Sequence, residues 1–340
     1  MSALDPSPWL GALPLAVTFE AFTDIGFWSG VAVLAGIYAV VALGLQMNVG
    51  YTGIVNFGQA GFMAIGGYSM AILVLKAGLS FWLALPASVL ITMAFGVIIG
   101  LPSLRLRADY FAIATIAMAE VVRLSAQNAR GLTGGNEGLF CETKGTDQVC
   151  FDDTWLSLSD SILDFVDNFW TDPETLVPLL LVVWVTVALG TVALFYAQRT
   201  PWGRVLRAIR EDEDAARALG KNTLLYKLQS LAISALLGAL AGFYLALFLA
   251  TIHPEDYEPL VTFFAYGVLV LGGLANYWGV AIGSIILWTV LEATRFIDLP
   301  ISEERQAALR FAIVGVALIL LMAFRPQGMF GKREEMVLGD

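Results

Sequence analysis

Long uninterrupted runs of apolar residues constrain the fold of this chain more than any other feature of its sequence. Several of them, such as residues 27–47 and 176–197, reach the length of about 18 residues that a helix needs to cross roughly 30 Å of hydrocarbon. Only 14% of the residues are charged, whereas soluble domains carry about a quarter. The sequence also lacks the alternating ten-residue segments that are typical of a membrane β-barrel. We therefore expect an all-α, polytopic membrane protein.

About nine stretches are candidates for membrane helices, with a range of eight to ten because the two glycine-rich segments need not cross simply. They are residues 27–47, 50–75, 81–100, 109–124, 176–197, 229–250, 259–271, 277–296 and 307–324. The apolar patch before the first span contains Pro14 and is too short to cross, so residues 1–27 are expected to form an interfacial N-terminus outside the cytoplasm. Residues 28–330 would form the membrane domain and residues 331–340 a cytoplasmic tail. The first basic residue is Lys76, so no secretory signal is predicted.

The distribution of Lys and Arg predicts the orientation of these spans, because basic loops stay in the cytoplasm. The turn at Arg105, the stretch 198–228 and the C-terminal tail are basic and are assigned to the cytoplasm. The loop 128–174 has two basic and ten acidic residues, a net charge of 2 − 10 = −8, and is assigned to the outside with the acidic turn 298–304. With nine spans, the N-terminus lies outside and the C-terminus inside.

The chain has two cysteines and a single histidine, residue types that can bind a metal ion. Cys141 and Cys150 share the acidic loop, and an oxidising compartment outside the membrane would permit a disulfide. Closing so short a loop would stabilise it by about 2–3 kcal/mol, and two unpaired thiols are the alternative. His253 has no partner His or Cys in its turn, which we expect to be solvated, so no metal site is predicted.

The stretch 198–228 contains seven of the 19 Lys and Arg residues and four consecutive acids at 211–214. Such charge costs several kcal/mol per group in lipid, so the stretch must lie in water. Its apolar positions recur at near-helical spacing and predict a short amphipathic helix that ends at Gly220; they are Leu206, Ile209, Ala216 and Leu219. We expect this helix to dock a soluble partner, with these four apolar residues filling a groove on that partner, and the alternative is an ordinary solvated connector.

The run GRVLRAIREDEDAARALGKN, residues 203–222, resembles the cytoplasmic loop of permease subunits in the branched-chain amino-acid ABC transporter family. The core Asp214-Ala215-Ala216-Arg217-Ala218-Leu219-Gly220 is similar to the Glu-Ala-Ala-x-x-x-Gly core of importer permeases, with Asp in place of the usual Glu. Residues 42–68, 104–124 with 132–135, 269–284 and 325–328 resemble further family patterns and extend the resemblance over most of 30–330. Within the family the chain resembles the second, M-type permease subunit, and urea and amide permeases are close relatives. The family commonly has Gly-His where this chain has Gly58-Gln59, and the acidic loop is longer than usual.

The resemblance implies an ABC importer permease fold in the bacterial inner membrane and a set of partner chains. These are a homologous second permease, two cytoplasmic ATPases and a periplasmic solute-binding protein, with no nucleic acid. The helix at 204–220 would couple the permease to the ATPases. The coupling residues implied in this way are Arg204, Arg207, Ile209, Arg210, Glu211, Asp212, Asp214, Ala215, Ala216, Leu219 and Gly220.

The chain itself has no phosphate-binding loop, since Gly220-Lys221 is followed by Asn222 and not by Ser or Thr. We therefore expect it not to be an enzyme and to hold no cofactor, with ATP and Mg²⁺ on the partner ATPases.

The two glycine-rich segments are the candidates for a translocation pathway. Seven glycines lie between Gly44 and Gly67 and five between Gly267 and Gly283. Interrupted helices in corresponding halves of a transporter often line the route, although close helix packing is the more common role of a single glycine. The candidate pathway residues are Tyr51, Asn56, Gln59, Thr133, Gly134, Gly272 and Gly273. Glu120 and Arg123 are expected to form a structural pair on one helix face.

The expected function is ATP-driven import of branched-chain or other neutral amino acids. Import of urea or short-chain amides by the same architecture is the alternative. A secondary transporter is less favoured because the apolar segments lack a dense set of acids for coupling ions, and a membrane-embedded enzyme because no catalytic constellation is present.

Overall fold

The computed structural model describes residues 25–293 apart from 145–146, 168–174 and 275, together with a few single positions beyond 304. The predictions for residues 1–24, the turn 298–304 and the tail 331–340 lie outside the described residues. The predicted span 307–324 lies largely outside them. Within the described part the chain is mainly helical, with one short hairpin.

The helices follow one another with short connections. The first part of the chain forms α1 (Ile25–Leu45), the π-helix η2 (Gln46–Thr52), α2 (Gln59–Leu75), α3 (Phe81–Ser103) and α4 (Ala108–Asn128). The acidic region forms α5 (Arg130–Thr133), η3 (Gly135–Glu137), β1 (Cys141–Lys144), β2 (Asp147–Cys150) and α6 (Asp153–Asp167). The remainder forms α7 (Val177–Arg199), α8 (Pro201–Glu211), α9 (Glu213–Ala218), α10 (Thr223–Leu249), η4 (Pro254–Tyr257), α11 (Pro259–Gly272) and α12 (Tyr277–Ala293).

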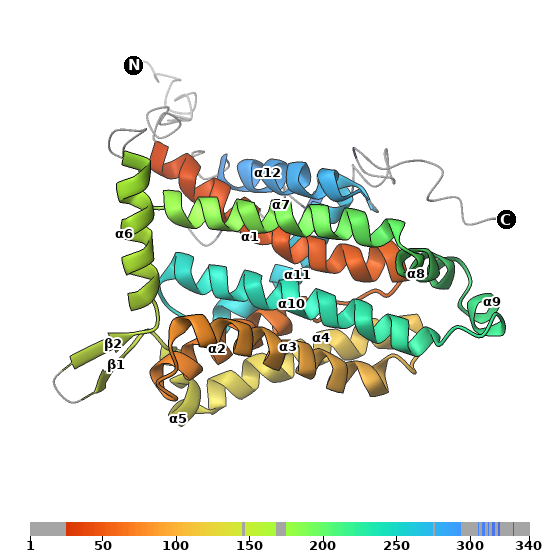
Figure 1. Ribbon diagram of the computed structural model, residues 1–340, viewed down its shortest axis with the longest axis horizontal. Coiled ribbons are helices and arrows are strands. Elements are labelled where there is room, and N and C mark those ends of the chain that lie inside the picture. Colours follow the sequence, from red (N-terminus) through yellow and green to blue (C-terminus); the bar gives the residue numbers. More distant parts are fainter. Residues whose placement is uncertain are drawn as a thin grey trace, which may run out of the picture.

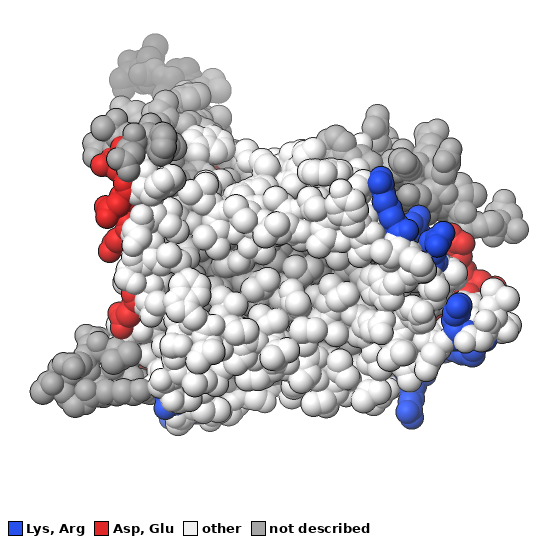
Figure 2. All heavy atoms as spheres, viewed as in Figure 1, with Lys and Arg blue, Asp and Glu red and all other residues white. Residues whose placement is uncertain are grey.

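The long helices lie side by side along the longest axis of the molecule, and the charged elements lie at its two ends (Figure 1). At one end α6 crosses the ends of the long helices, while α8 and α9 project from the opposite end. The space-filling view shows acidic residues along α6, both basic and acidic residues around α8 and α9, and an almost uncharged face between the two ends (Figure 2). This separation of charge agrees with two polar ends flanking an apolar belt.

The described part of the chain does not confirm the nine spans that the sequence predicts. Four helical stretches in the described part are long and apolar enough to cross a membrane: Ile25–Thr52, Phe81–Ser103, Val177–Arg199 and Thr223–Leu249. A fifth span results if α11 and α12, which meet at 117°, are counted as one. The apolar helix α2 has only 17 residues, and α4 carries Asp109, Glu120 and Arg123. About nine spans are therefore not confirmed.

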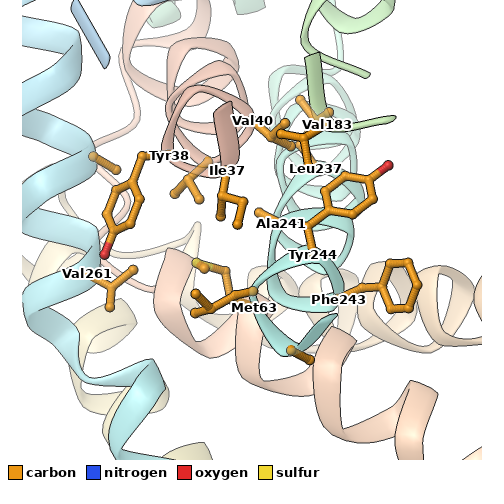
Figure 3. Close-up of a cluster of buried hydrophobic side chains, with 14 of the residues drawn as sticks. Ile37, Tyr38, Val40, Met63, Val183, Leu237, Ala241, Phe243, Tyr244 and Val261 are labelled. Atoms are coloured by element: carbon orange, nitrogen blue, oxygen red, sulfur yellow. The ribbon is translucent and has the colours of Figure 1, made fainter. Parts of the chain in front are cut away.

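Two helices, α1 and α10, form the centre of the bundle. On α1 Ile37, Val40 and Val41 are completely buried, because α7, α10, α11 and α12 all pack around this helix. Figure 3 shows how Ile37 and Val40 lie close to Leu237 and Ala241 of α10, with Met63 of α2 below them. A helix that is apolar on all sides is expected at such a buried position.

Glycine allows α2 and α10 to approach each other closely. A Cβ atom built on Gly242 of α10 would lie 2.0 Å from the carbonyl oxygen of Met63, and one on Gly66 of α2 would lie 2.4 Å from the Cα of Ala239. Neither position can hold a side chain without separating the two backbones. Small residues bring membrane helices together in this way because lipid provides no hydrophobic driving force for their association.

The acidic region 128–174 is a folded element where the structure describes it. Cys141 and Cys150 face each other across the hairpin, and their sulfur atoms are bonded. The hairpin leads into α6, whose Trp155 and Ser159 are buried while its aspartates face outward. Leu139 and Ile252 exchange two backbone hydrogen bonds of 3.0 Å, which tie this region to the turn before η4.

The same turn places His253 differently from the sequence prediction. His253 is half-buried, and its backbone N–H donates to Asp256 Oδ2 at 3.0 Å. It begins the short helix η4 and is therefore not a freely solvated loop residue.

Close packing of α2 on α10 predicts a position-specific effect of adding one methyl group. Gly242→Ala should lower the stability of the protein by about 1–3 kcal/mol because the new Cβ overlaps the backbone of Met63. Gly30→Ala is the matched control, since no atom lies within 4 Å of a Cβ at that helical position. Thermal unfolding in detergent should show a lower midpoint for Gly242→Ala only; equal midpoints for the two variants would contradict this packing.

Candidate coupling surface and polar break

The first glycine-rich segment breaks a helix, and side chains from other helices satisfy the backbone at the break. Residues 53–58 have no regular secondary structure between η2 and α2. The N–H of Phe57 donates to Thr115 Oγ1 of α4 and the N–H of Ala60 donates to Thr262 Oγ1 of α11, both at 3.0 Å. The Tyr266 hydroxyl donates to the carbonyl oxygen of Asn56 at 2.9 Å. Irregular backbone survives at membrane depth only with such partners.

Asn56 is buried at this break, and only one of the two polar atoms of its side-chain amide has a hydrogen-bond partner among the described residues. Its Oδ1 accepts a hydrogen bond from the N–H of Gly58 at 2.8 Å, while its Nδ2 has no partner among the described residues. The residue lines a narrow apolar pocket with Phe62, Phe95 and Met118. A buried donor without an acceptor costs about 1–3 kcal/mol, so Asn56 can gain from a ligand that brings an acceptor into the pocket. Its assignment to the pathway stays a prediction.

Gln59 is also buried, but it finds its partners within the chain. Its Nε2 donates to the carbonyl oxygen of Ser234 at 3.0 Å, and its Oε1 accepts from Ser234 Oγ at 2.9 Å. Gly44 and Gly238 leave the space for this amide, because a Cβ on either would approach Gln59 Nε2 to 3.0 Å or less. Gln59 therefore needs no solute to satisfy its polar atoms, because Ser234 of α10 pairs with both, and its assignment to the pathway stays a prediction.

Tyr51 joins η2 to two other elements. Its hydroxyl donates to Gln198 Oε1 at the end of α7 at 2.8 Å, and its ring stacks on Tyr277 of α12 with centroids 5.2 Å apart. Only 2% of Tyr51 is exposed. The residue holds the end of the first span to the bend between α11 and α12.

Thr133 and Gly134 lie at the other end of α2. Thr133 Oγ1 donates to the carbonyl oxygens of Ala126 and Ala129, which closes the turn after α4. Gly134 adopts a φ of 73°, a conformation that favours glycine. Lys76 at the end of α2 donates to the carbonyl oxygen of Gly131, so this turn and Asn56 are separated by the length of α2, about 25 Å.

Gly272 and Gly273 form the bend between α11 and α12. A Cβ on Gly272 would lie 2.3 Å from the carbonyl oxygen of Gly279, and Gly273 has a φ of 92°. The two glycines thus permit a tight helical hairpin, as the packing alternative predicts. Among the candidate pathway residues, Thr133 and Gly134 thus lie apart from Asn56, whereas Tyr51 lies next to the bend formed by Gly272 and Gly273.

The stretch 198–228 contains two short helices, α8 and α9, where the sequence predicts one. Helix α8 ends at Glu211, and α9 begins at Glu213. Between them Asp212 is extended, and its Oδ1 accepts a hydrogen bond from the N–H of Ala215 at 2.9 Å. Asp212 is therefore the N-cap of α9, because it satisfies an amide that the first turn of a helix leaves free.

The apolar positions of these helices divide into buried and exposed ones. Leu206, Ile209 and Ala216 are at most 4% exposed and pack against the rest of this chain, whereas Leu219 is 81% exposed. The expectation that all four enter a groove on a partner is wrong for the three buried residues. They attach α8 and α9 to the membrane domain and leave a charged outer surface. The exposed residues of the predicted coupling set are Arg204, Arg207, Glu211, Asp212, Asp214, Ala215, Leu219 and Gly220.

Gly220 ends α9 as the sequence pattern predicts. It has a φ of 78°, and its N–H donates to the carbonyl oxygen of Arg217 at 2.9 Å. The N–H of Lys221 donates to the carbonyl oxygen of Ala216 at 3.2 Å. These two bonds form a Schellman motif, in which a left-handed glycine reverses the chain after a helix. Asn222 then caps α10 by accepting from the N–H of Leu225.

Arg210 connects α8 directly to the break in the first span. Its Nη1 donates to the carbonyl oxygen of Gly50 in η2 at 2.6 Å. Its aliphatic part packs on Gly53, where a Cβ would lie 3.3 Å from Arg210 Cγ. Arg207 donates in addition to the carbonyl oxygen of Gln198, the residue that holds Tyr51. A shift of α8 is thereby passed to η2 and to the residues that follow it.

Glu213 is a functional position that the sequence pattern did not single out. It accepts from Arg217 at 3.0 Å and from Lys227 on α10, so it fastens α9 to the bundle. Partial burial by itself would raise the pKa of Glu213, but the hydrogen bond and charge of Lys227 and the charge of Arg217 hold it below its ordinary value. A lysine 14 residues away gives no periodic signal, which is why the pair is visible only in the structure.

Glu120 and Arg123 form the predicted pair on α4. Arg123 donates through Nε to Oε2 at 2.9 Å and through Nη2 to Oε1 at 2.5 Å. This two-point contact satisfies both groups within one helix face.

Comparison with known proteins decides the family. Residues 27–322 match the sequence profile of the family described as "Branched-chain amino acid transport system / permease component". The chain belongs to the branched-chain amino-acid transport permease family. The transport role of its relatives agrees with the prediction that the chain is a permease component and not an enzyme.

Individual relatives agree with this membership. The chain is 32% identical to the high-affinity branched-chain amino acid transport system permease protein LivM of Escherichia coli over 305 residues, which cover 88% of this chain and 69% of the relative. It is 25% identical to a probable LivM permease of Methanocaldococcus jannaschii, covering 88% and 91% of the two chains. The E. coli LivH permease is 27% identical, covering 88% and 93%. No solved structure matches the chain.

The contact between Arg210 and Gly50 predicts that α8 and η2 are coupled in their local stability. Arg210→Gln should remove the charged hydrogen bond and raise amide hydrogen exchange in residues 46–53 by about tenfold, the effect of a loss of about 1.5 kcal/mol. Arg204→Gln is the matched control, because Arg204 is exposed on the same helix and has no side-chain hydrogen bond among the described residues. Hydrogen exchange followed by mass spectrometry measures both. Unchanged exchange in Arg210→Gln would mean that the contact transmits nothing to η2.

Proposed function

We propose that this chain is the membrane subunit of an ATP-driven importer for branched-chain or other neutral amino acids. The family described above and the names of its relatives, LivM and LivH, support the class of solute. The family relatives do not favour urea or short-chain amides. The observation that carries the coupling part of the proposal is the pair of helices α8 and α9, fastened to the break in the first span through Arg210.

The geometry of α8 and α9 suits a docking surface for a cytoplasmic ATPase. Leu206, Ile209 and Ala216 anchor the helices, and Arg210 and Glu213 tie them to η2 and α10. The outer surface combines charges with one exposed apolar residue, Leu219. A partner that pushes this surface moves η2 and the unwound segment 53–58 together with it. ATP and Mg²⁺ would be bound by the partner, because this sequence has no phosphate-binding loop.

The end that carries α8 and α9 is proposed to lie in the cytoplasm. The basic residues gather there, while the acidic α6 lies at the opposite end (Figure 2). This orientation places the hairpin with Cys141 and Cys150 outside, where a solute-binding protein would deliver its cargo. A second, homologous permease would complete the route, and the family includes two kinds of permease that are similar to this chain.

Asn56 is the residue that we propose to contact the solute. Its unpaired Nδ2 favours a ligand that carries a hydrogen-bond acceptor, such as a carboxylate. Its neighbours Phe62, Phe95 and Met118 suit an aliphatic side chain of that ligand. The pocket is narrow in this structure, so the solute would enter when segment 53–58 moves. Such an arrangement would couple the position of α8 to the exposure of Asn56.

The left-handed conformation of Gly220 supplies a test of the coupling helices. Gly220→Val should strain the end of α9 and lower transport by about tenfold, since a β-branched residue at positive φ costs more than 1 kcal/mol. Gly220→Asn is the matched control, because Asn tolerates this conformation. Neither side chain meets another atom within 4 Å of the Cβ, so only the backbone distinguishes them.

The measurement uses proteoliposomes that contain the chain with its partner ATPases and second permease, with ATP inside and the solute-binding protein and labelled leucine outside. ATP hydrolysis should persist in Gly220→Val while leucine uptake falls. Equal uptake by the Val and Asn variants would refute the coupling role of this turn, and uptake of labelled urea in place of leucine would refute the solute class.

Asn56 and Gln59 should respond differently to substitution. Asn56→Ser keeps an oxygen that can accept from Gly58, removes the unpaired Nδ2 and leaves only a shorter hydroxyl donor, so it should raise KM for leucine by about tenfold with little change in thermal stability. Gln59→Ala should lower the unfolding midpoint, because Ser234 loses both hydrogen bonds. Uptake kinetics and thermal unfolding of the same preparations separate the two effects. A normal KM in Asn56→Ser would exclude Asn56 as a solute contact.

A further inference from the structure

A cavity of about 750 Å³ opens beside α9, at the ends of two membrane-spanning helices. Its walls come from four places: the unwound residues 53–55, the turn between α3 and α4, the end of α8 with α9, and the first turns of α10. Because α3 ends at Ser103 and α10 begins at Thr223, the cavity lies where hydrocarbon gives way to water. It is distinct from the narrow pocket beside Asn56.

The cavity is strongly cationic. Six basic residues line it, namely Arg105, Arg107, Arg210, Arg217, Lys221 and Lys227, and Glu213 is the one acidic residue among its lining. Glu213 already pairs with Arg217 and Lys227. Arg105, Arg107 and Lys221 are exposed and have no ion pair in the part of the chain that the structure describes. Three cations on two different segments therefore face the same cavity without a counter-charge.

The behaviour of Glu213 agrees with a positive field inside this cavity. Burial disfavours its charged form, yet the hydrogen bond from Lys227 and the nearby charges of Lys227 and Arg217 lower its pKa. A second anion placed between Arg105, Arg107 and Lys221 would experience the same attraction. An anion with several acceptor oxygens matches the several guanidinium donors best.

The cavity also has an apolar side, which a small inorganic anion would leave unused. Ile54, Leu104, Phe111 and Ile209 line it next to the basic residues. On the last turns of α3, Ile98 and Leu101 are 65% and 42% exposed and continue the apolar surface along the span. The arrangement suits a molecule with an anionic head and an apolar body.

We propose that this cavity binds the phosphate headgroup of an anionic membrane phospholipid, with its acyl chains along the exposed face of α3. Basic pockets at the cytoplasmic ends of membrane helices favour such headgroups. The bound phosphate bridges the α3–α4 turn, through Arg105 and Arg107, to the start of α10, through Lys221. The lipid therefore steadies α9 and the coupling surface beside Arg210, which lines the same cavity.

This site differs from a general excess of basic residues on the cytoplasmic side. A general excess of basic residues sets the orientation of the protein and does not require the cations to face one cavity. If only that excess mattered, neutralising any basic residue at this end should weaken lipid binding to a similar degree. The cavity predicts instead that three particular cations act together. Lipid binding in this cavity depends on neither the solute nor ATP, so failure of the lipid proposal would leave the proposed transport function untouched.

The test measures lipid binding to the full-length protein in detergent by native mass spectrometry. Phosphatidylglycerol should bind at least tenfold more tightly than zwitterionic phosphatidylcholine, and the preference should shrink at high salt. The triple variant Arg105→Gln, Arg107→Gln, Lys221→Gln should lose about 100-fold in affinity for phosphatidylglycerol, about fivefold for each cation. The variant Arg105→Lys, Arg107→Lys should retain binding, which shows that charge and not misfolding is responsible.

Arg199→Gln combined with Arg204→Gln is the control, since both residues are at the same end of the molecule and outside the cavity. Equal losses in the control and the triple variant would overturn the site in favour of a general charge effect. Equal binding of the two lipids by the wild type would overturn it as well. If inorganic phosphate at millimolar concentration competes as well as the lipid, the phosphate site stands and its assignment to a lipid is overturned.

Discussion

Hydrogen bonding of the backbone at membrane depth is the constraint on which the rest of this structure depends. The first span cannot stop being helical at Thr52 unless other groups take over its amides and carbonyls. Thr115, Thr262 and Tyr266 do so from α4 and α11. The break in one helix therefore fixes the positions of two others. Gln59 and Ser234 extend the same principle to α10, where a fully paired amide lies in the centre of the bundle.

Much of the fold can be predicted from local sequence patterns, because hydrophobic length and turn chemistry are local. The spans Phe81–Ser103 and Val177–Arg199 follow from apolar runs, and Gly220 is identified as a helix end from its position after an apolar repeat. The apolar repeat predicts the wrong helix boundaries where a single residue favours the end of a helix. Asp212 interrupts the predicted helix at 204–220, since its carboxylate caps a new helix more favourably than it continues the old one.

The candidate site is less predictable, since its contacts join residues that are distant in the sequence. Arg210 binds the carbonyl oxygen of Gly50, 160 residues away, and a carbonyl has no signature in the sequence at all. Spacing identifies Leu206, Ile209, Ala216 and Leu219 as an apolar stripe but cannot say which partner covers it. The fold answers that question by burying three of them against this chain. An apolar stripe has the same spacing in the sequence whether it is buried against its own chain or against a partner.

The close contact between α2 and α10 has a mechanical consequence. Two helices whose backbones approach as closely as those at Gly66 and Gly242 resist sliding past each other, so a movement of α10 would carry α2 with it. Helix α10 has 27 residues and is about 40 Å long. A tilt of about 10° at the end near α9 would then displace the far end by about 7 Å. A small rotation at the charged end is in this way converted into a displacement large enough to open or close a passage for a molecule the size of an amino acid.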